Sequence, residues 1–186
     1  VLLGRRDAAC LREPGEPARI VFAGAFNPLH VGHRRMTEVA EDLLGAGVHF
    51  EISVVNVDKP PMDYTAMECR AGQFAPDRPV WFTRAATFEE KSQLFPEATF
   101  VVGVDTLRRI AAPRYYEDDE RARHKAIGRI ADRGCRFLVF GRDMGTGFMR
   151  LGDLDLPEPL LKICREVPPE RFREDISSTE LRHRGC

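Results

Sequence analysis

The chain has 186 residues, of which 43% are hydrophobic and 31% charged, a composition typical of one ordinary globular domain. Lys and Arg total 28 against 29 Asp and Glu, which gives a formal net charge of −1. This balance argues against a dedicated nucleic-acid-binding protein or a polybasic membrane-binding protein, because both need a dominant positive field. No apolar run approaches the roughly 20 residues of a membrane span, and the first ten residues do not have the form of a signal peptide.

The cysteines are widely spaced and form no C-x-x-C pair: Cys10, Cys69, Cys135, Cys164 and Cys186. This pattern predicts reduced thiols in the cytoplasm, not a disulfide framework or a structural zinc site. We expect residues 1–18 to be a lead-in linker and residues 19–186 to be a single domain. The linker-like start without Met predicts fusion behind an upstream domain, and a homo-oligomer is compatible with the sequence.

Short apolar runs alternate with longer helical patterns along the chain. Strands are predicted at residues 19–23, 50–57, 80–82, 99–102 and 136–140, and helices at about 31–44 and 116–133. The second helix carries charges of both signs, which is typical of a solvated face. This alternation predicts a Rossmann-like, doubly wound α/β fold with a mostly parallel sheet of five to six strands flanked by helices. Such sheets bind ligands beyond the carboxyl ends of their strands, so the loops after the apolar runs are the candidate site.

The loop after the first predicted strand reads G-A-F-N-P-L-H-V-G-H from Gly24 to His33. Gly24 permits a tight turn, and His30 and His33 share one face of the first helical turn, with the small Gly32 between them. Together with the free N–H groups of a helix start, this pattern predicts a polyphosphate site where two imidazoles stabilise developing negative charge. The alternatives are an ordinary strand-to-helix turn with surface histidines, or an H-x-x-H zinc site, which lacks a third ligand nearby.

A second candidate segment lies near the end of the chain. Ser177 and Glu180 form an S-x-x-E capping box, which starts a helix whatever else the segment does. Three consecutive hydroxyl residues, Ser177, Ser178 and Thr179, with Arg182 one turn later, also suit a second phosphate site.

Other polar residues follow the remaining apolar runs. Asp105 follows the run at 99–102 and suits ribose hydroxyls or a helix cap. Lys59 follows the run at 50–57 and suits a phosphate, although the segment also reads as a proline-stiffened exit loop. Arg142 follows the run at 136–140 and is either a phosphate ligand or a surface residue. Trp81 lies in a predicted strand, where core packing is favoured over stacking on a ligand.

The loop string resembles the H-x-G-H signature of the nucleotidylyltransferase superfamily, most closely the G-x-F-N-P-x-H-x-G-H form of nicotinamide-mononucleotide adenylyltransferases. The string I-S-S-T-E-L-R at 176–182 resembles the second signature of that superfamily, which binds the β- and γ-phosphates. The segment 102–107 resembles its G-x-D-x-L element, whose Asp contacts the nucleotide. The chain lacks the K-M-S-K-S loop that aminoacyl-tRNA synthetases carry in place of this second signature. It also lacks the R-T-x-G-I-S-T-T form of many cytidylyltransferases, and this second absence favours ATP over CTP.

The resemblance covers about residues 19–182 and implies a nucleotidyltransferase that moves AMP from Mg²⁺-bound ATP to a phosphate-bearing acceptor such as nicotinamide mononucleotide, a step of NAD biosynthesis. It implies catalysis by His30 and His33. The implied nucleotide and phosphate ligands are Gly24, Ala25, Phe26, Asn27, Gly32, Gly103, Asp105, Arg142, Ile176, Ser177, Ser178, Thr179 and Arg182. The implied acceptor contacts are Lys59, Trp81 and Lys91. Open alternatives are another acceptor (a phosphopantetheine, a sugar phosphate or a flavin mononucleotide), CTP as donor, a non-catalytic nucleotide-binding module, or a structural scaffold.

Overall fold

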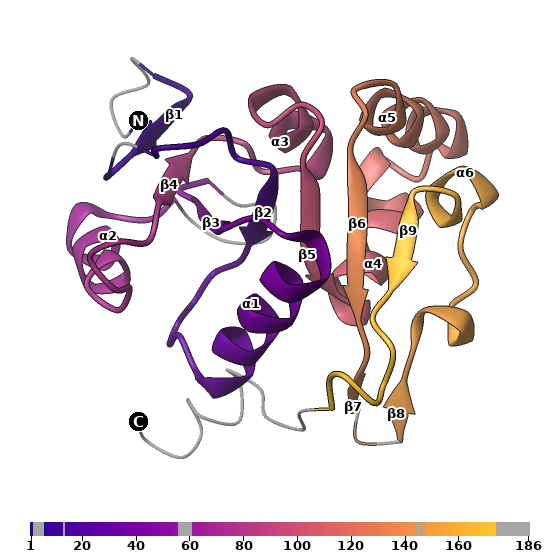
Figure 1. Cartoon of the computed structure of the whole chain (residues 1–186). Helices are drawn as coiled ribbons and strands as arrows, with labels where there is room; N and C mark the ends of the chain where they lie inside the picture. Colours follow the sequence, from indigo (N-terminus) through magenta and orange to yellow (C-terminus); the bar gives the residue numbers. More distant parts are fainter. Residues whose placement is uncertain (2–5, 13, 56–60, 144, 146, 174–186) are drawn as a thin grey trace.

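The computed structural model describes residues 1, 6–12, 14–55, 61–143, 145 and 147–173 (Figure 1). The strands are β1 Ala8–Cys10, β2 Ile20–Ala23, β3 Val48–Ser53, β4 Val80–Thr83, β5 Thr99–Gly103, β6 Arg136–Phe140, β7 Arg142–Asp143, β8 Phe148–Met149 and β9 Cys164–Glu166. The α-helices are α1 Val31–Leu44, α2 Tyr64–Ala71, α3 Phe88–Leu94, α4 Val104–Ala111, α5 Glu120–Asp132 and α6 Glu158–Leu161, and the 3-10 turns are η1 Pro113–Tyr116 and η2 Leu151–Asp153.

Seven strands form one Rossmann-like sheet in the order β1-β4-β3-β2-β5-β6-β9. All neighbours are parallel except β1, which pairs antiparallel to β4. The chain adds β3 and β4 on one side of β2 and then β5, β6 and β9 on the other, so the order reverses between β2 and β5. The carboxyl ends of β5, β6 and β9 point to the bottom of Figure 1. A sheet of this type binds its ligand where the strand order reverses.

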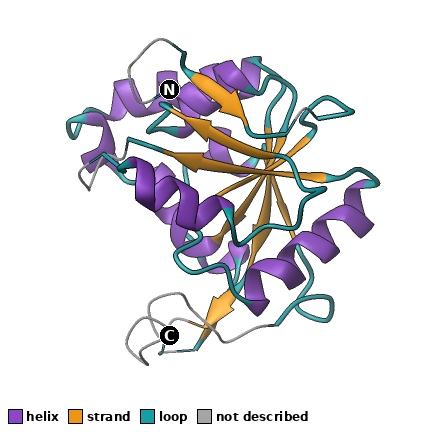
Figure 2. Ribbon diagram, turned by 90° about the vertical axis from the view of Figure 1, so that its left-hand side faces the viewer, coloured by secondary structure: helices purple, strands orange, loops and turns teal. Residues whose placement is uncertain are grey.

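Alternating side chains divide the apolar core into two layers, one on each face of the sheet. In β2, Ile20 and Phe22 pack on one face and Val21 on the other, as the two-residue period of a strand requires. Helices α1 and α2 cover the first face, and α3, α4 and α5 cover the second. Figure 2 shows helices on both sides of the twisted sheet. This two-layer covering confirms the predicted α/β class.

Two short strands make the sheet larger than the five to six strands expected. The edge strand β1 lies inside residues 1–18, where we expected a linker, and pairs with Trp81, Phe82 and Thr83 of β4. Its sequence, Ala-Ala-Cys, has no apolar alternation and no branched side chain, so only its partner strand identifies it. The other addition, β9, extends the opposite edge beside β6. The strand expected at 50–57 is observed as β3, which begins two residues earlier and covers Val48–Ser53, while residues 56 and 57 lie outside the described residues.

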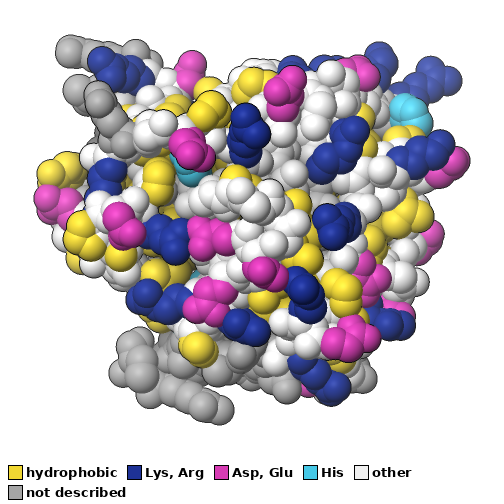
Figure 3. Space-filling model, in the orientation of Figure 1, with side chains coloured by type: hydrophobic (Ala, Val, Ile, Leu, Met, Phe, Trp, Pro, Cys, Tyr) yellow, Lys and Arg dark blue, Asp and Glu magenta, His cyan; other side chains and the backbone are white. Residues whose placement is uncertain are grey.

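The helix boundaries follow local capping chemistry. The predicted helix at 31–44 is confirmed as α1, which ends at Gly45 with a φ of 69°. The charged helix expected over 116–133 starts later, at Glu120, because the Asp119 side chain accepts a hydrogen bond from the Arg121 N–H at 2.7 Å. Basic and acidic side chains are interspersed on the face in Figure 3. No helix among the described residues has the length and apolar character needed to cross a membrane.

Candidate functional site

The loop between β2 and α1 is built around the buried ring of Phe26. This residue has a φ of 44°, in the left-handed region, and its side chain is 1% exposed. The ring packs edge-on against Phe22 at 5.2 Å and Phe74 at 5.4 Å between centroids. A Cβ on Gly24 would lie 2.8 Å from Cζ of Phe26, so the glycine is required by the close approach of this ring.

His30 and His33 form a stacked pair at the start of α1. His30 is the extended N-cap residue, with φ −132° and ψ 174°. Its backbone N–H donates to Nδ1 of His33 over 3.3 Å, and the two rings stack with centroids 3.7 Å apart. Because Nδ1 of His33 accepts this bond, a neutral His33 carries its proton on Nε2 and presents an N–H donor.

The surroundings of both imidazoles oppose protonation. Burial lowers the pKa of His33 from 6.5 to about 3, with the charges of His30 and Arg142 acting in the same direction. Burial also lowers the pKa of His30, and the charge of Arg142 adds to this effect. Nδ1 of His30 is buried and has no hydrogen-bond partner in the described part of the chain. A buried polar atom of this kind is unusual in a folded protein and marks a site that merits a functional explanation.

Asp105 and Arg142 meet at the same edge of the sheet. Nη1 of Arg142, just after β6, lies 3.2 Å from Oδ2 of Asp105, just after β5, and each side chain is about one-third exposed. A Cβ on Gly103 would lie 2.6 Å from Oδ1 of Asp105, so glycine leaves room for this carboxylate. The N-cap of α4 is Gly103, not Asp105, which corrects the capping alternative. Since the charge of Arg142 acts on both histidines, residues after β2, β5 and β6 share one site.

The other predicted ligands of the first loop lie in or beside it. Ala25 is exposed, and its carbonyl accepts a hydrogen bond from Arg70 at 3.2 Å. Asn27 is also exposed, and its peptide bond to Pro28 is cis. Gly32 is buried in the first turn of α1. The remaining predicted residues Lys59, Ile176, Ser177, Ser178, Thr179 and Arg182 lie outside the described residues.

Trp81 is not brought to the histidines. Its Nε1–H donates to Nδ1 of His49 at 3.2 Å, and its ring packs edge-on against Phe95 at 5.4 Å. Trp81 lines a cavity of about 770 Å³ together with Arg19, which directly precedes β2, and Thr99, the first residue of β5. Its side chain therefore lies toward the amino ends of the strands. This placement contradicts the expected contact with the acceptor and agrees with the packing alternative.

Lys91 is also unavailable to an acceptor. Its Nζ donates to Oε1 of Glu51 at 2.8 Å and to the Ala85 carbonyl at 2.7 Å, and its side chain is 6% exposed. Oε1 of Glu51 additionally accepts a hydrogen bond from the Thr83 hydroxyl at 2.5 Å. Because a buried ammonium requires a partner, Lys91 is held in the core between α3 and β3 by these contacts. This corrects the assignment of Lys91 to the acceptor site.

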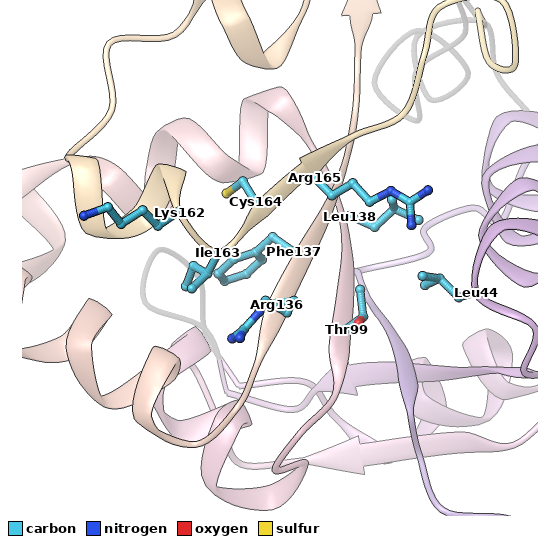
Figure 4. A pocket seen from close by; sticks show the side chains of 9 residues that line it. All are labelled: Leu44, Thr99, Arg136, Phe137, Leu138, Lys162, Ile163, Cys164 and Arg165. Carbon is cyan, nitrogen blue, oxygen red and sulfur yellow. The ribbon is translucent and has the colours of Figure 1, made fainter.

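A smaller cavity of about 250 Å³ also lies at the amino ends of the strands, around the edge formed by β6 and β9 (Figure 4). Phe137, Leu138 and Ile163 supply apolar wall, and Arg136, Lys162 and Arg165 extend from its rim. It therefore opens at the end of the sheet opposite to the histidines.

Two residues of the site escaped sequence analysis. Gln73 and Arg70, at the end of α2, hold the backbone of the first loop through their side chains. They are separated from their loop partners by 44 to 47 residues, and nothing in their own segment indicates that contact.

Comparison with known families agrees with this geometry. A family model described as cytidylyltransferase-like matches residues 21–184. The match includes both histidines, the Asp105–Arg142 pair and the second signature string. A comparison with curated proteins found no match.

Proposed function

Because this chain belongs to the cytidylyltransferase-like family of nucleotidyltransferases, we propose that it transfers AMP from ATP to a phosphate-bearing acceptor such as nicotinamide mononucleotide. The observation that supports this most is the meeting of a neutral histidine pair with Arg142 where the strand order reverses. The preference for ATP rests on the sequence of the loop from Gly24 to His33 and on the absence of the cytidylyltransferase-type second signature.

The reaction is an in-line displacement at phosphorus. An oxygen of the acceptor phosphate forms a bond to the α-phosphorus, the bond from that phosphorus to the bridging oxygen of the β-phosphate breaks, and pyrophosphate leaves with the electron pair. Chemistry of this type needs positioning and charge neutralisation more than a covalent nucleophile. The Nε2–H of His33, an N–H of His30 and the guanidinium of Arg142 supply hydrogen bonds and positive charge to the negative charge of the transition state.

The nucleotide is held from several strands. Asp105 accepts hydrogen bonds from the ribose, and Ser177, Ser178, Thr179 and Arg182 bind the leaving pyrophosphate. Mg²⁺ bound to the triphosphate would neutralise part of its charge, and its ligands would be largely phosphate oxygens and water, as this ion prefers. Oδ2 of Asp105 already accepts a hydrogen bond from Arg142, so we assign it no metal-binding role. Lys59 remains our candidate for the acceptor phosphate.

The test is pyrophosphate release from MgATP and, separately, from MgCTP, with nicotinamide mononucleotide as acceptor. We expect release that depends on the acceptor and is faster with ATP. In the His33→Ala variant the turnover should fall by about 10²–10³-fold, the effect of losing one transition-state donor. Faster pyrophosphate release with CTP would show that CTP, not ATP, is the nucleotide donor. Undiminished turnover in His33→Ala would show that His33 takes no part in catalysis.

A non-catalytic nucleotide-binding module gives a different result. ATP would then stabilise the folded chain, by about 2.7 kcal/mol at 100 times its Kd, without any release of pyrophosphate. The proposed transferase would be overturned if this outcome held with each of four acceptors: nicotinamide mononucleotide, a phosphopantetheine, a sugar phosphate and flavin mononucleotide.

A further inference from the structure

The end of α2 lies against the loop that carries the histidines. Gln73, two residues beyond the helix, contacts this loop with both ends of its amide. Its Oε1 accepts a hydrogen bond from the Leu29 N–H at 2.7 Å, and its Nε2–H donates to the Phe26 carbonyl at 3.0 Å. One half-buried side chain thus spans the loop from Phe26 to Leu29, immediately before His30.

These contacts satisfy backbone groups that have no partner in a regular element. The N–H of Leu29 and the carbonyl of Phe26 lie in the loop between β2 and α1, outside the strand ladder and the helix, so each needs a side-chain or water partner. An amide side chain carries a donor and an acceptor in one rigid plane and can satisfy both. Charged side chains of Lys, Arg, Asp or Glu offer only one kind of group and would leave the other backbone atom unpaired.

The rest of the loop is fixed in the same way from distant parts of the chain. Nη1 of Arg70 donates to the Ala25 carbonyl at 3.2 Å, and the Gly24 N–H donates to the Glu51 carbonyl at 3.0 Å. The loop backbone between Gly24 and Leu29 is therefore held by β3 and by the end of α2. Its last fixed group, the Leu29 N–H, is one residue from the N–H of His30 that orients the His33 ring.

We propose that Gln73 is a positioning residue: its amide clamps the span Phe26–Leu29 and thereby sets the location of the His30–His33 pair at the start of α1. The proposal rests on the transfer reaction proposed above, but it can be tested apart from it. Gln73 touches the loop backbone and no reacting atom, so its effect on the reaction passes through the histidines.

Loss of the clamp should act mainly on the chemical step. A displacement of catalytic groups by about 1 Å can lower a rate by about 10²-fold, even when the altered residue lies away from the chemistry. The nucleotide also contacts other strands, so its binding should change less. We therefore expect a lower kcat with a KM for ATP changed by less than about 3-fold, because the lost contact acts on the transition state more than on the bound substrate.

The experiment compares three variants of the whole chain. Gln73→Met keeps the length of the side chain and removes both hydrogen bonds. Gln73→Glu keeps the acceptor for Leu29 and removes the donor to Phe26. Gln93→Met is the matched control, because Gln93 is an exposed glutamine on α3, away from the loop. Three quantities are measured: the kcat and the KM of pyrophosphate release, and the pKa values of the histidines from NMR titration of their ring protons.

We expect Gln73→Met to lower kcat by about 10²-fold and to move the pKa of His33 from about 3 toward its ordinary 6.5, as the ring loses its fixed, buried place. Gln73→Glu should likewise lower kcat and raise the pKa of His33, and Gln93→Met should change neither kcat nor this pKa. If Gln73→Met is too unstable to measure, the kcat of Gln73→Glu decides the question, because the added carboxylate by itself raises the pKa of nearby histidines.

A Gln73→Met variant with wild-type kcat and wild-type histidine titration would overturn the clamp. Should the wild-type protein release no pyrophosphate with any acceptor, the transferase proposal fails, and the titration of His33 alone then decides whether Gln73 positions the pair. An unchanged titration in that case would refute the clamp as well.

Discussion

The ammonium of Lys91 lies 2.8 Å from the carboxylate of Glu51, and the two side chains form a buried ion pair between α3 and β3. The pair is tied to the first loop through the backbone, because the carbonyl of the same Glu51 accepts a hydrogen bond from the Gly24 N–H. Removing one member of a buried pair leaves an uncompensated charge in the core, which costs far more than an exposed contact of the same length.

Lys91→Met should therefore lower the free energy of unfolding by about 3–5 kcal/mol in urea denaturation. The matched control is Lys162→Met. Lys162 also lies 2.8 Å from a glutamate, Glu158, but both side chains are at least 70% exposed, so the change should stay within about 1 kcal/mol. An unchanged stability in Lys91→Met, together with a raised KM for the acceptor, would return Lys91 to the acceptor site.

His33 should make the protein sensitive to mild acid. Its pKa is lowered from 6.5 to about 3 in the folded state, so the unfolded chain binds the extra proton between these values. The neutral ring therefore contributes stability that is complete above pH 6.5 and is lost as the pH falls toward 3. The slope should approach about 1.4 kcal/mol per pH unit between those limits.

The measurement is urea denaturation of the wild type and of His33→Gln at several pH values from 7 to 4. Burial also lowers the pKa of His30 and of His49, so both add to the slope of each protein. The difference between the two profiles isolates His33. Parallel profiles would show that this ring is not buried in the neutral form.

Gly24→Ala should disturb the loop. The new Cβ would meet the Phe26 ring at 2.8 Å, and this ring is buried among other aromatic side chains and cannot move freely. We expect a loss of about 1–3 kcal/mol of stability, as for other overpacked sites, accompanied by lower turnover.

Gly128→Ala is the matched control for this change. Gly128 lies within α5, and a Cβ there would meet nothing within 4 Å. Alanine is the better helix former, so this variant should gain about 1 kcal/mol. If thermal unfolding shows the same change for both variants, the close approach of Phe26 to Gly24 does not restrict residue 24.

Arg142→Met should raise the pKa of His33 and of His30, because the positive charge that opposes their protonation is removed. Stability should change by less than about 1 kcal/mol, since the Arg142–Asp105 pair is about one-third exposed. The affinity for ATP should fall, because the variant loses the phosphate ligand that we propose.

NMR titration of the histidines and calorimetric binding of ATP measure these two effects. Arg165→Met provides the control, because Arg165 extends from the rim of a cavity at the opposite end of the sheet. Histidine titrations that stay the same in Arg142→Met would show that this arginine does not belong to the same site.

The sequence by itself determined the fold class and the part of the site that is local. The helix Val31–Leu44 and the strands around 20–23, 80–83, 99–103 and 136–140 follow from apolar periodicity and capping residues, which are properties of neighbouring residues. The pairing of His30 with His33 follows from their spacing on one helical turn. The loops after parallel strands are predicted to converge, and this rule also places Asp105 and Arg142 in the same site as the histidines.

Only the tertiary structure decided the contacts made across the sheet. Trp81 and Lys91 have side chains suited to a ligand site. The position of Trp81 on β4 directs its ring to His49 and the amino ends of the strands. The packing of α3 against the sheet directs Lys91 to Glu51 in the core. Gln73 reaches a loop 44 residues earlier because α2 packs beside it. Strand β1 exists through its pairing with β4, since three small residues carry no pattern of their own. Each of these outcomes depends on which distant element supplies the partner, and periodicity along the chain contains no information about that choice.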